Sequence, residues 1–196
     1  MNEDKETHDR IIRYVAIREG RLAGTSPEEV VKKALDEKVD EGINIVITYI
    51  RAGGKVTKLI ICLTKVALIA LSAEPDDNLI IVCKDPVQMK KTILKTQLTC
   101  KLVEVFPTYA FMQDLLKYRL QSKVSKLPPD EIKLLTAAYT GRDLPRIAID
   151  DPIVKYFRGK EGDVFKFTRT NCGAGETIHC RMVTSRISHF SFSLEK

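Results

Sequence analysis

Apolar residues at helical spacing open the chain. Between residues 4 and 22 they recur close to the period of a helix, with charged residues between them. A second run of this kind follows Thr25-Ser26-Pro27 and two acidic residues, an order typical of a helix start. The pattern therefore predicts two helices, over residues 4–22 and from about residue 25 to about residue 39.

Beyond Gly42 the pattern changes to short apolar runs separated by turns. The predicted strands are Ile43–Arg51, Val56–Leu63, Leu79–Cys83 and Leu102–Phe106. A Gly-Gly turn joins the first two as a hairpin, and Asp85–Leu94 predicts a helix between the last two. Because a strand–helix–strand order typically joins parallel strands, we expect a partly parallel sheet. Val66–Ser72 fits either a strand or a short helix.

The last third of the chain has a different organisation. Gln113–Lys126 is mixed and polar, and the Pro-Pro-Asp sequence at 128–130 predicts a helix that ends near Tyr139. Val164–Arg169 and Thr177–Val183 predict two paired strands, followed by a Ser-rich tail over 184–196. We therefore predict an α+β protein. Residues 1–120 form an α/β domain with two helices and a small mixed sheet, and residues 121–196 form a small mixed domain.

The chain has 44% hydrophobic and 30% charged residues, the balance of a globular protein, and a formal net charge of +6. The charge balance is −3 over residues 1–50, +4 over residues 51–100 and +5 over the remainder. A basic excess suits contact with nucleic acid or an acidic partner, although many proteins without either carry it. One basic group lies around the predicted turn after Cys83, and it comprises Lys84, Lys90, Lys91 and Lys95. It fits a helix face exposed to solvent or a path for DNA.

Catalytic and metal-binding chemistry finds little support. No pair of the five cysteines has C-x-x-C spacing, and the local cluster of Cys172, His179 and Cys180 lacks a fourth zinc ligand. We therefore expect free thiols in a reducing compartment. The three histidines are isolated, and Asp151 before Pro152 fits a helix cap better than a catalytic acid. No catalytic residue, metal or cofactor is predicted.

The N-terminal residues are charged and lack the apolar stretch of a signal peptide. The longest apolar run, Leu59–Leu71, is interrupted and too short to span a bilayer. We therefore expect a soluble intracellular protein.

One ordered group of motifs is specific. Leu-Pro-Arg-Ile at 144–147 is followed by Asp-Pro-Ile-Val-Lys-Tyr-Phe at 151–157, then by Gly-Lys-Glu-Gly at 159–162 and the strand to Arg169. This block, with the helix start at 127–135, resembles the C-terminal assembly domain of the fifth-largest subunit of eukaryotic-type RNA polymerase. Residues 78–116 resemble, more thinly, the jaw domain of the eukaryotic members, a domain that the archaeal counterpart lacks.

The resemblance implies a non-catalytic structural subunit of a multisubunit DNA-directed RNA polymerase, without a cofactor. The C-terminal domain would dock on the largest subunit, and the jaw-like domain would lie near downstream double-stranded DNA and attract it weakly. The implied partner interface is Leu144, Pro145, Arg146, Ile147, Asp151, Pro152, Tyr156, Gly162 and Arg181. The implied DNA-proximal residues are Lys84, Pro86, Lys90, Lys91 and Lys95. The site of action would be the nucleus, or a viral factory or virion.

The chain also departs from the family pattern. Its segment 170–181 replaces the family's Ser-Glu-Thr-Ala-Gly-Arg-Tyr stretch, although Arg181 matches the Arg of the final strand. Asp85 stands where an acid would repel DNA phosphate, and the 184–196 tail runs past the usual end.

Independently of the resemblance, Pro145 stiffens residues 144–147 into an extended strip. That strip suits either docking on another chain or packing inside its own domain. Two other functions are open. One is a free-standing DNA-binding regulator of transcription, and the other is a nuclease-like enzyme built around Asp76, Asp77, Lys84 and Asp85.

Overall fold

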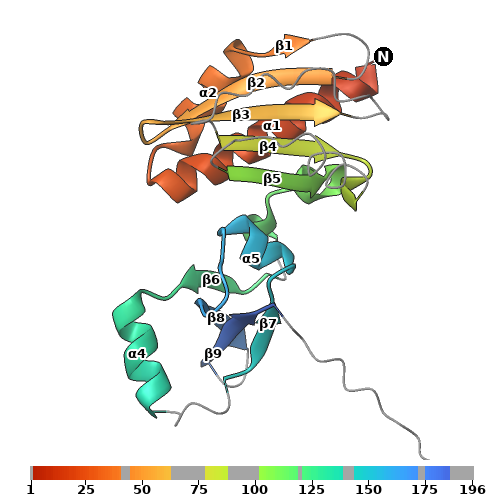
Figure 1. Ribbon diagram of the computed structural model, residues 1–196. Coiled ribbons are helices and arrows are strands. Elements are labelled where there is room, and N and C mark those ends of the chain that lie inside the picture. Colours follow the sequence, from red (N-terminus) through yellow and green to blue (C-terminus); the bar gives the residue numbers. More distant parts are fainter. Residues whose placement is uncertain are drawn as a thin grey trace, which may run out of the picture. The chain divides into compact units, whose positions relative to one another are not determined.

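The computed structural model describes residues 2–40, 45–62, 78–87, 102–118, 121–138, 144–171 and 175–185. The chain divides into two compact units, Met1–Asp114 and Leu115–Lys196. Both units combine helices with a β-sheet, which confirms the predicted α+β class (Figure 1). Among the helices within the described ranges, none has both the length and the apolar character that crossing a bilayer requires.

The two predicted N-terminal helices are α1 (Asn2–Ala23) and α2 (Pro27–Asp36). Gly24, directly after α1, has a φ of +68°, a conformation that glycine adopts without a Cβ clash and that commonly ends helices. Ser26 occupies the cap position of α2, but its side chain makes no capping hydrogen bond. The start of α2 therefore depends on Pro27 and the acidic first turn rather than on a side-chain cap.

The first unit contains a five-stranded sheet with the order β1-β2-β3-β4-β5. Its strands are β1 (Val39–Asp40), β2 (Ile45–Ala52), β3 (Lys55–Cys62), β4 (Asn78–Cys83) and β5 (Leu102–Pro107). The first three strands are antiparallel, and β2 and β3 form the predicted hairpin. The pairs β3–β4 and β4–β5 are parallel, so the prediction of a partly parallel sheet is confirmed. Most of the predicted helix after Asp85, and all of Val66–Ser72, lie outside the described residues.

Both faces of this sheet are apolar. The helices α1 and α2 lie against one face (Figure 1), where the core includes Ile11, Val15, Ile50 and Leu59. Alternate residues of the same strands, among them Leu79, form a second buried cluster on the opposite face. Two-sided burial explains why Leu79–Cys83 is an uninterrupted apolar run.

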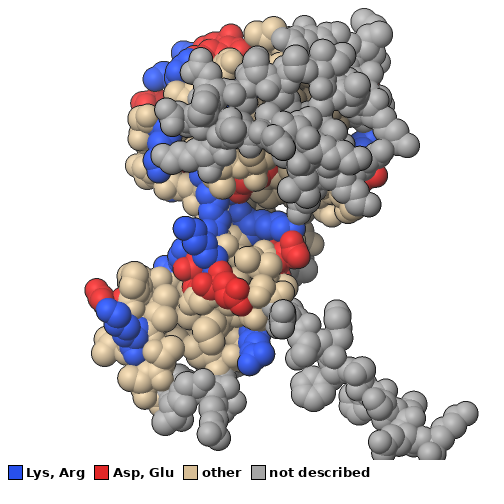
Figure 2. Space-filling model, in the orientation of Figure 1, with Lys and Arg blue, Asp and Glu red and all other residues tan. Residues whose placement is uncertain are grey.

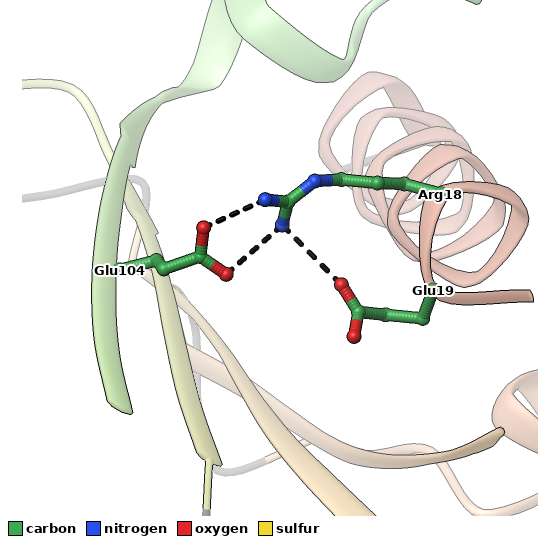
Figure 3. A network of polar contacts seen from close by, with 3 residues as sticks. All are labelled: Arg18, Glu19 and Glu104. Atoms are coloured by element: carbon green, nitrogen blue, oxygen red, sulfur yellow. Dashed lines mark hydrogen bonds and ion pairs between the residues drawn. The ribbon is translucent and has the colours of Figure 1, made fainter. Parts of the chain in front are cut away.

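An ion pair between the fully buried Arg18 and the partly buried Glu104 joins α1 to β5 (Figure 3). Both terminal nitrogens of Arg18 donate to the carboxylate of Glu104, at 2.6 and 3.1 Å. Arg18 Nη1 also lies 3.3 Å from Glu19 Oε1, and the guanidinium carbon lies 5.0 Å from the centre of the Phe106 ring. Arg18 has no exposed surface, so its charge is compensated inside the protein rather than by water.

The second unit contains a four-stranded sheet with the order β6-β8-β9-β7. Its elements are β6 (Lys123–Lys126), α4 (Pro129–Ala138), β7 (Arg146–Ala148), α5 (Pro152–Tyr156), β8 (Val164–Asn171) and β9 (Gly175–Thr184). β8 and β9 are the predicted strand pair, and β7 is parallel to β9. β6 lies in the segment that the sequence pattern describes only as mixed and polar, because just one of its four residues is apolar.

The core of the second unit is small. Val154 and Phe165 have no exposed surface, and Ile147, Ile153 and Val183 pack with them. α4 contributes no buried residue, and Leu134 on that helix is 74% exposed. The fold of this unit therefore depends on one face of the sheet and on α5.

Candidate partner-docking site

The strip at 144–147 becomes an edge strand of the second unit. Ile147 pairs with Val183 and is 4% exposed, whereas Arg146 pairs with Met182 and is exposed. Pro145 is also exposed, and its carbonyl accepts a hydrogen bond from the Met182 N–H at 2.9 Å. The strip thus packs inside its own domain through Ile147 and turns Pro145 and Arg146 outward.

The free edge of β7 is short, because the strand has only three residues. The Pro145 carbonyl and the Ile149 N–H both form hydrogen bonds with β9. Because alternate residues of a strand present their backbone groups to opposite edges, those of Arg146 and Ala148 lie at the free edge of β7. The Ala148 carbonyl accepts a hydrogen bond from the Asp151 N–H at 3.0 Å, which shortens the open edge further. The edge therefore offers a partner strand few backbone groups, those of Arg146 and the Ala148 N–H, beside the exposed Arg146 side chain.

Asp151 caps α5, as predicted. Its Oδ1 accepts a hydrogen bond from the Ile153 N–H at 2.8 Å, and Pro152 occupies the first turn. The cap directs α5 so that Val154 and Tyr156 are buried, while Pro152 is exposed.

Replacing Asp151 by Ala is expected to lower the free energy of unfolding by about 1 kcal/mol, because an orphan N–H of α5 loses its acceptor. Urea unfolding followed by circular dichroism measures the change. The matched control is Asp150→Ala, which removes a carboxylate that is 78% exposed and paired with Lys155. The control should cost less than about 0.5 kcal/mol. Equal losses in the two variants would contradict the capping role.

The segment at 159–162 is a turn rather than a phosphate-binding loop. Gly162 has a φ of +86°, and its N–H donates to the Val183 carbonyl at 3.0 Å. A Cβ on Gly159 would lie 2.7 Å from Val154 and 2.9 Å from Phe165, so this glycine allows the turn to approach the core closely. The turn therefore holds α5 against the sheet.

The structure divides the predicted interface residues by exposure. Pro145, Arg146, Pro152, Gly162 and Arg181 are exposed, Leu144 and Asp151 are half-buried, and Ile147 and Tyr156 are buried. The Arg181 guanidinium carbon lies 5.5 Å from the centre of the Phe167 ring. The exposed members can contact a partner directly, and the buried ones support the fold beneath them.

The described charges of the second unit are mixed. Figure 2 shows both basic and acidic side chains on the face of this unit turned to the viewer. Residues 1–114 hold equal numbers of Lys/Arg and Asp/Glu, so the formal net charge of +6 belongs to residues 115–196.

Two of the predicted DNA-proximal residues lie in described structure. Lys84 is exposed and Pro86 is half-buried at the end of β4, while Asp85 Oδ1 accepts a hydrogen bond from the Val87 N–H. Lys90, Lys91 and Lys95 lie outside the described residues, as do Asp76 and Asp77 of the nuclease alternative and Cys172 of the cysteine–histidine cluster. Within the described ranges, no three His, Cys, Asp or Glu side chains converge on a metal site.

Two of the free thiols are packing groups. Cys62 and Cys83 are partners in the parallel β3–β4 register and belong to the buried cluster around Leu79. Burial raises the pKa of Cys62, and burial together with the neighbouring Cys62 raises the pKa of Cys83 to about 11. Both thiols therefore stay protonated near neutral pH and are poor nucleophiles and poor metal ligands.

Sequence reasoning missed the polar contacts that fasten α1 within the first unit. Besides the Arg18–Glu104 pair, Arg21 donates to both carboxylate oxygens of Asp114, at 2.7 and 2.8 Å. A signal was present, because Arg18 continues the spacing of Ile11 and Val15 on the buried face of α1. Glu104 likewise interrupts the apolar run of β5.

Comparison with known proteins gives a match to one family model, the C-terminal domain of RNA polymerase Rpb5, over residues 113–183. "DNA-directed RNA polymerase subunit Rpo5" of Archaeoglobus fulgidus is 36% identical over 76 residues, which is 99% of that protein and 35% of this chain. The chain belongs to the Rpb5 family of RNA polymerase subunits. The matched residues cover the described part of the second unit except Thr184 and Ser185.

Other family members differ in how much of them this chain spans. Rpo5 of Methanococcus vannielii is 39% identical over 61 residues, covering 78% of that protein and 30% of this chain. "DNA-directed RNA polymerase subunit 5" of Acanthamoeba polyphaga mimivirus is 30% identical over 82 residues, covering 41% of this chain. This chain spans only 40% of the mimiviral protein, and the family model matches residues 113–183, nearly all of which belong to the second unit.

Proposed function

We propose that this Rpb5-family chain is a non-catalytic structural subunit of a multisubunit DNA-directed RNA polymerase, and that its second unit docks on the largest subunit. One observation carries the proposal: the family match over 113–183 nearly coincides with a compact unit beginning at Leu115. Within that unit, Pro145 and Arg146 are exposed at a sheet edge, and the next residue, Ile147, is buried. An exposed arginine on a strand that is hydrogen-bonded to its sheet is suited to a specific protein interface.

We further propose that the first unit lies near downstream DNA and attracts it only weakly. Support comes from Lys84 and Pro86 after β4 and from the sequence positions of Lys90, Lys91 and Lys95. The balance of charges in residues 1–114, together with Asp85 beside Lys84, argues against tight binding by this unit. The chain would act in the compartment of its polymerase: the nucleus, or a viral factory or virion.

Purification of the tagged chain from its native source tests the docking role. We expect the two largest polymerase subunits in near-equal amounts, and Arg146→Asp should lower their recovery about tenfold, because a reversed charge at a docking edge is strongly unfavourable. The control is Lys160→Asp, a charge reversal at an exposed residue of the α5–β8 turn. Recovery of the chain alone, or with DNA and without polymerase, would exclude the subunit role and favour a free-standing DNA-binding protein.

A further inference from the structure

The face of the second sheet opposite its core carries an open surface. Along β8 and β9, the core residues Phe165 and Val183 alternate with residues that point to the other side. Val164 lies on that side but is buried, so the open part begins beyond it. Eight of the accessible residues that the strand register places on that side are Lys123 and Ser125 on β6, Lys166 and Thr168 on β8, Ile178, Cys180 and Met182 on β9, and Arg146 on β7. We call these eight residues the outer face.

Apolar side chains form the middle of the outer face. Ile178, Cys180 and Met182 follow one another along one side of β9, and Ile178 is 56% exposed while the other two are half-buried. An apolar row that remains accessible on a regular sheet is typical of a surface that another molecule covers.

Cations flank this row. Lys123 and Lys166 lie on the β6–β8 side, and Arg146 lies on the β7 side, beside Met182. Within the described part of the chain these three make no ion pair, whereas Lys126 pairs with Asp163 at 2.7 Å and Lys155 with Asp150 at 3.0 Å. Glu176, at the far end of β9, is the acidic residue that shares this face in the described strands.

We infer that the outer face binds an acidic protein segment that carries an apolar anchor residue and belongs to another polymerase subunit. The inference rests on the proposed function. It extends the docking surface from Arg146 to the other residues of the outer face. Three cations without carboxylate partners in the described structure attract a negative segment, and the apolar row between them accepts its anchor. Nucleic acid fits less well, because the described positions of this face carry no aromatic side chain for base stacking.

A photo-crosslinking amino acid in place of Ile178 tests the inference in the assembled polymerase. We expect a covalent product with one polymerase subunit, at a peptide that holds more Asp and Glu than Lys and Arg. The same amino acid in place of Lys160, which lies off the outer face, should not react with that peptide. A product with DNA or RNA, a product with a basic peptide, or no product from position 178 would overturn the inference.

Charge reversal gives a second, independent test. Lys123→Glu combined with Lys166→Glu in the full chain should lower recovery of the polymerase about tenfold, with a smaller difference at high salt. Lys160→Glu should change recovery less than about twofold. Unchanged recovery of the double variant would overturn the inference while leaving the subunit role intact. Failure of the unmodified chain to recover any polymerase subunit would instead exclude the subunit role itself.

Discussion

Replacing Glu104 by Ala is expected to lower the free energy of unfolding of the first unit by about 3 to 5 kcal/mol. The carboxylate accepts two hydrogen bonds from Arg18, a residue with no exposed surface. Without Glu104 the guanidinium remains buried and loses two charge-assisted hydrogen bonds, while the Glu19 carboxylate stays 3.3 Å away. Hydrogen exchange of the β3–β5 amides during urea unfolding of the full chain would assign the loss to this unit.

Two further variants test whether the stability lost in Glu104→Ala comes from leaving the Arg18 charge buried or only from losing the ion-pair contact. Arg18→Met combined with Glu104→Leu removes both charges and keeps apolar volume, so it should be more stable than Glu104→Ala alone. Glu37→Gln is the exposed control, because Glu37 pairs with Arg51 at 3.1 Å where the side chains are 36% and 53% exposed. It should cost less than about 1 kcal/mol. A Glu104→Ala loss no larger than that of Glu37→Gln would show that water reaches Arg18.

The sequence predicted the elements whose hydrophobic period is clear and missed those defined by tertiary contacts. The hairpin of β2 and β3 follows from two β-branched runs around a Gly-Gly turn. β6 has no such pattern, because it is held by pairing with β8 rather than by an apolar face of its own. The buried pair Arg18–Glu104 joins residues 86 positions apart, a distance over which local spacing carries no information.

In the candidate site, too, local features were predictable from the sequence and tertiary ones were not. The cap by Asp151 and the turn at 159–162 are local, and their residue types predict them. Whether residues 144–147 pack inward or outward depends on β9, which lies further along the chain and pairs with this strip. In the structure Ile147 points inward and Arg146 outward, and the outer face of the sheet can be defined only once the register of four strands is known.

Adjacent charge substitutions at 146 and 147 are therefore expected to have different effects. Ile147→Asp should lower the free energy of unfolding of the second unit by at least about 4 kcal/mol, because it removes a buried apolar side chain and places an unpaired carboxylate in the core around Phe165. Arg146→Asp should change stability by less than about 0.5 kcal/mol, because its side chain is exposed.

Stability and polymerase recovery must be measured on both variants to separate the two roles. Hydrogen exchange of the β8–β9 amides in the full chain reports the fold of the second unit, and co-purification reports docking. We expect Ile147→Asp to lose amide protection and polymerase together, and Arg146→Asp to keep protection while losing polymerase. If Arg146→Asp keeps both, the docking surface lies elsewhere on this unit. If it loses both, Arg146 stabilises the fold, and the loss of polymerase follows from unfolding rather than from a missing contact.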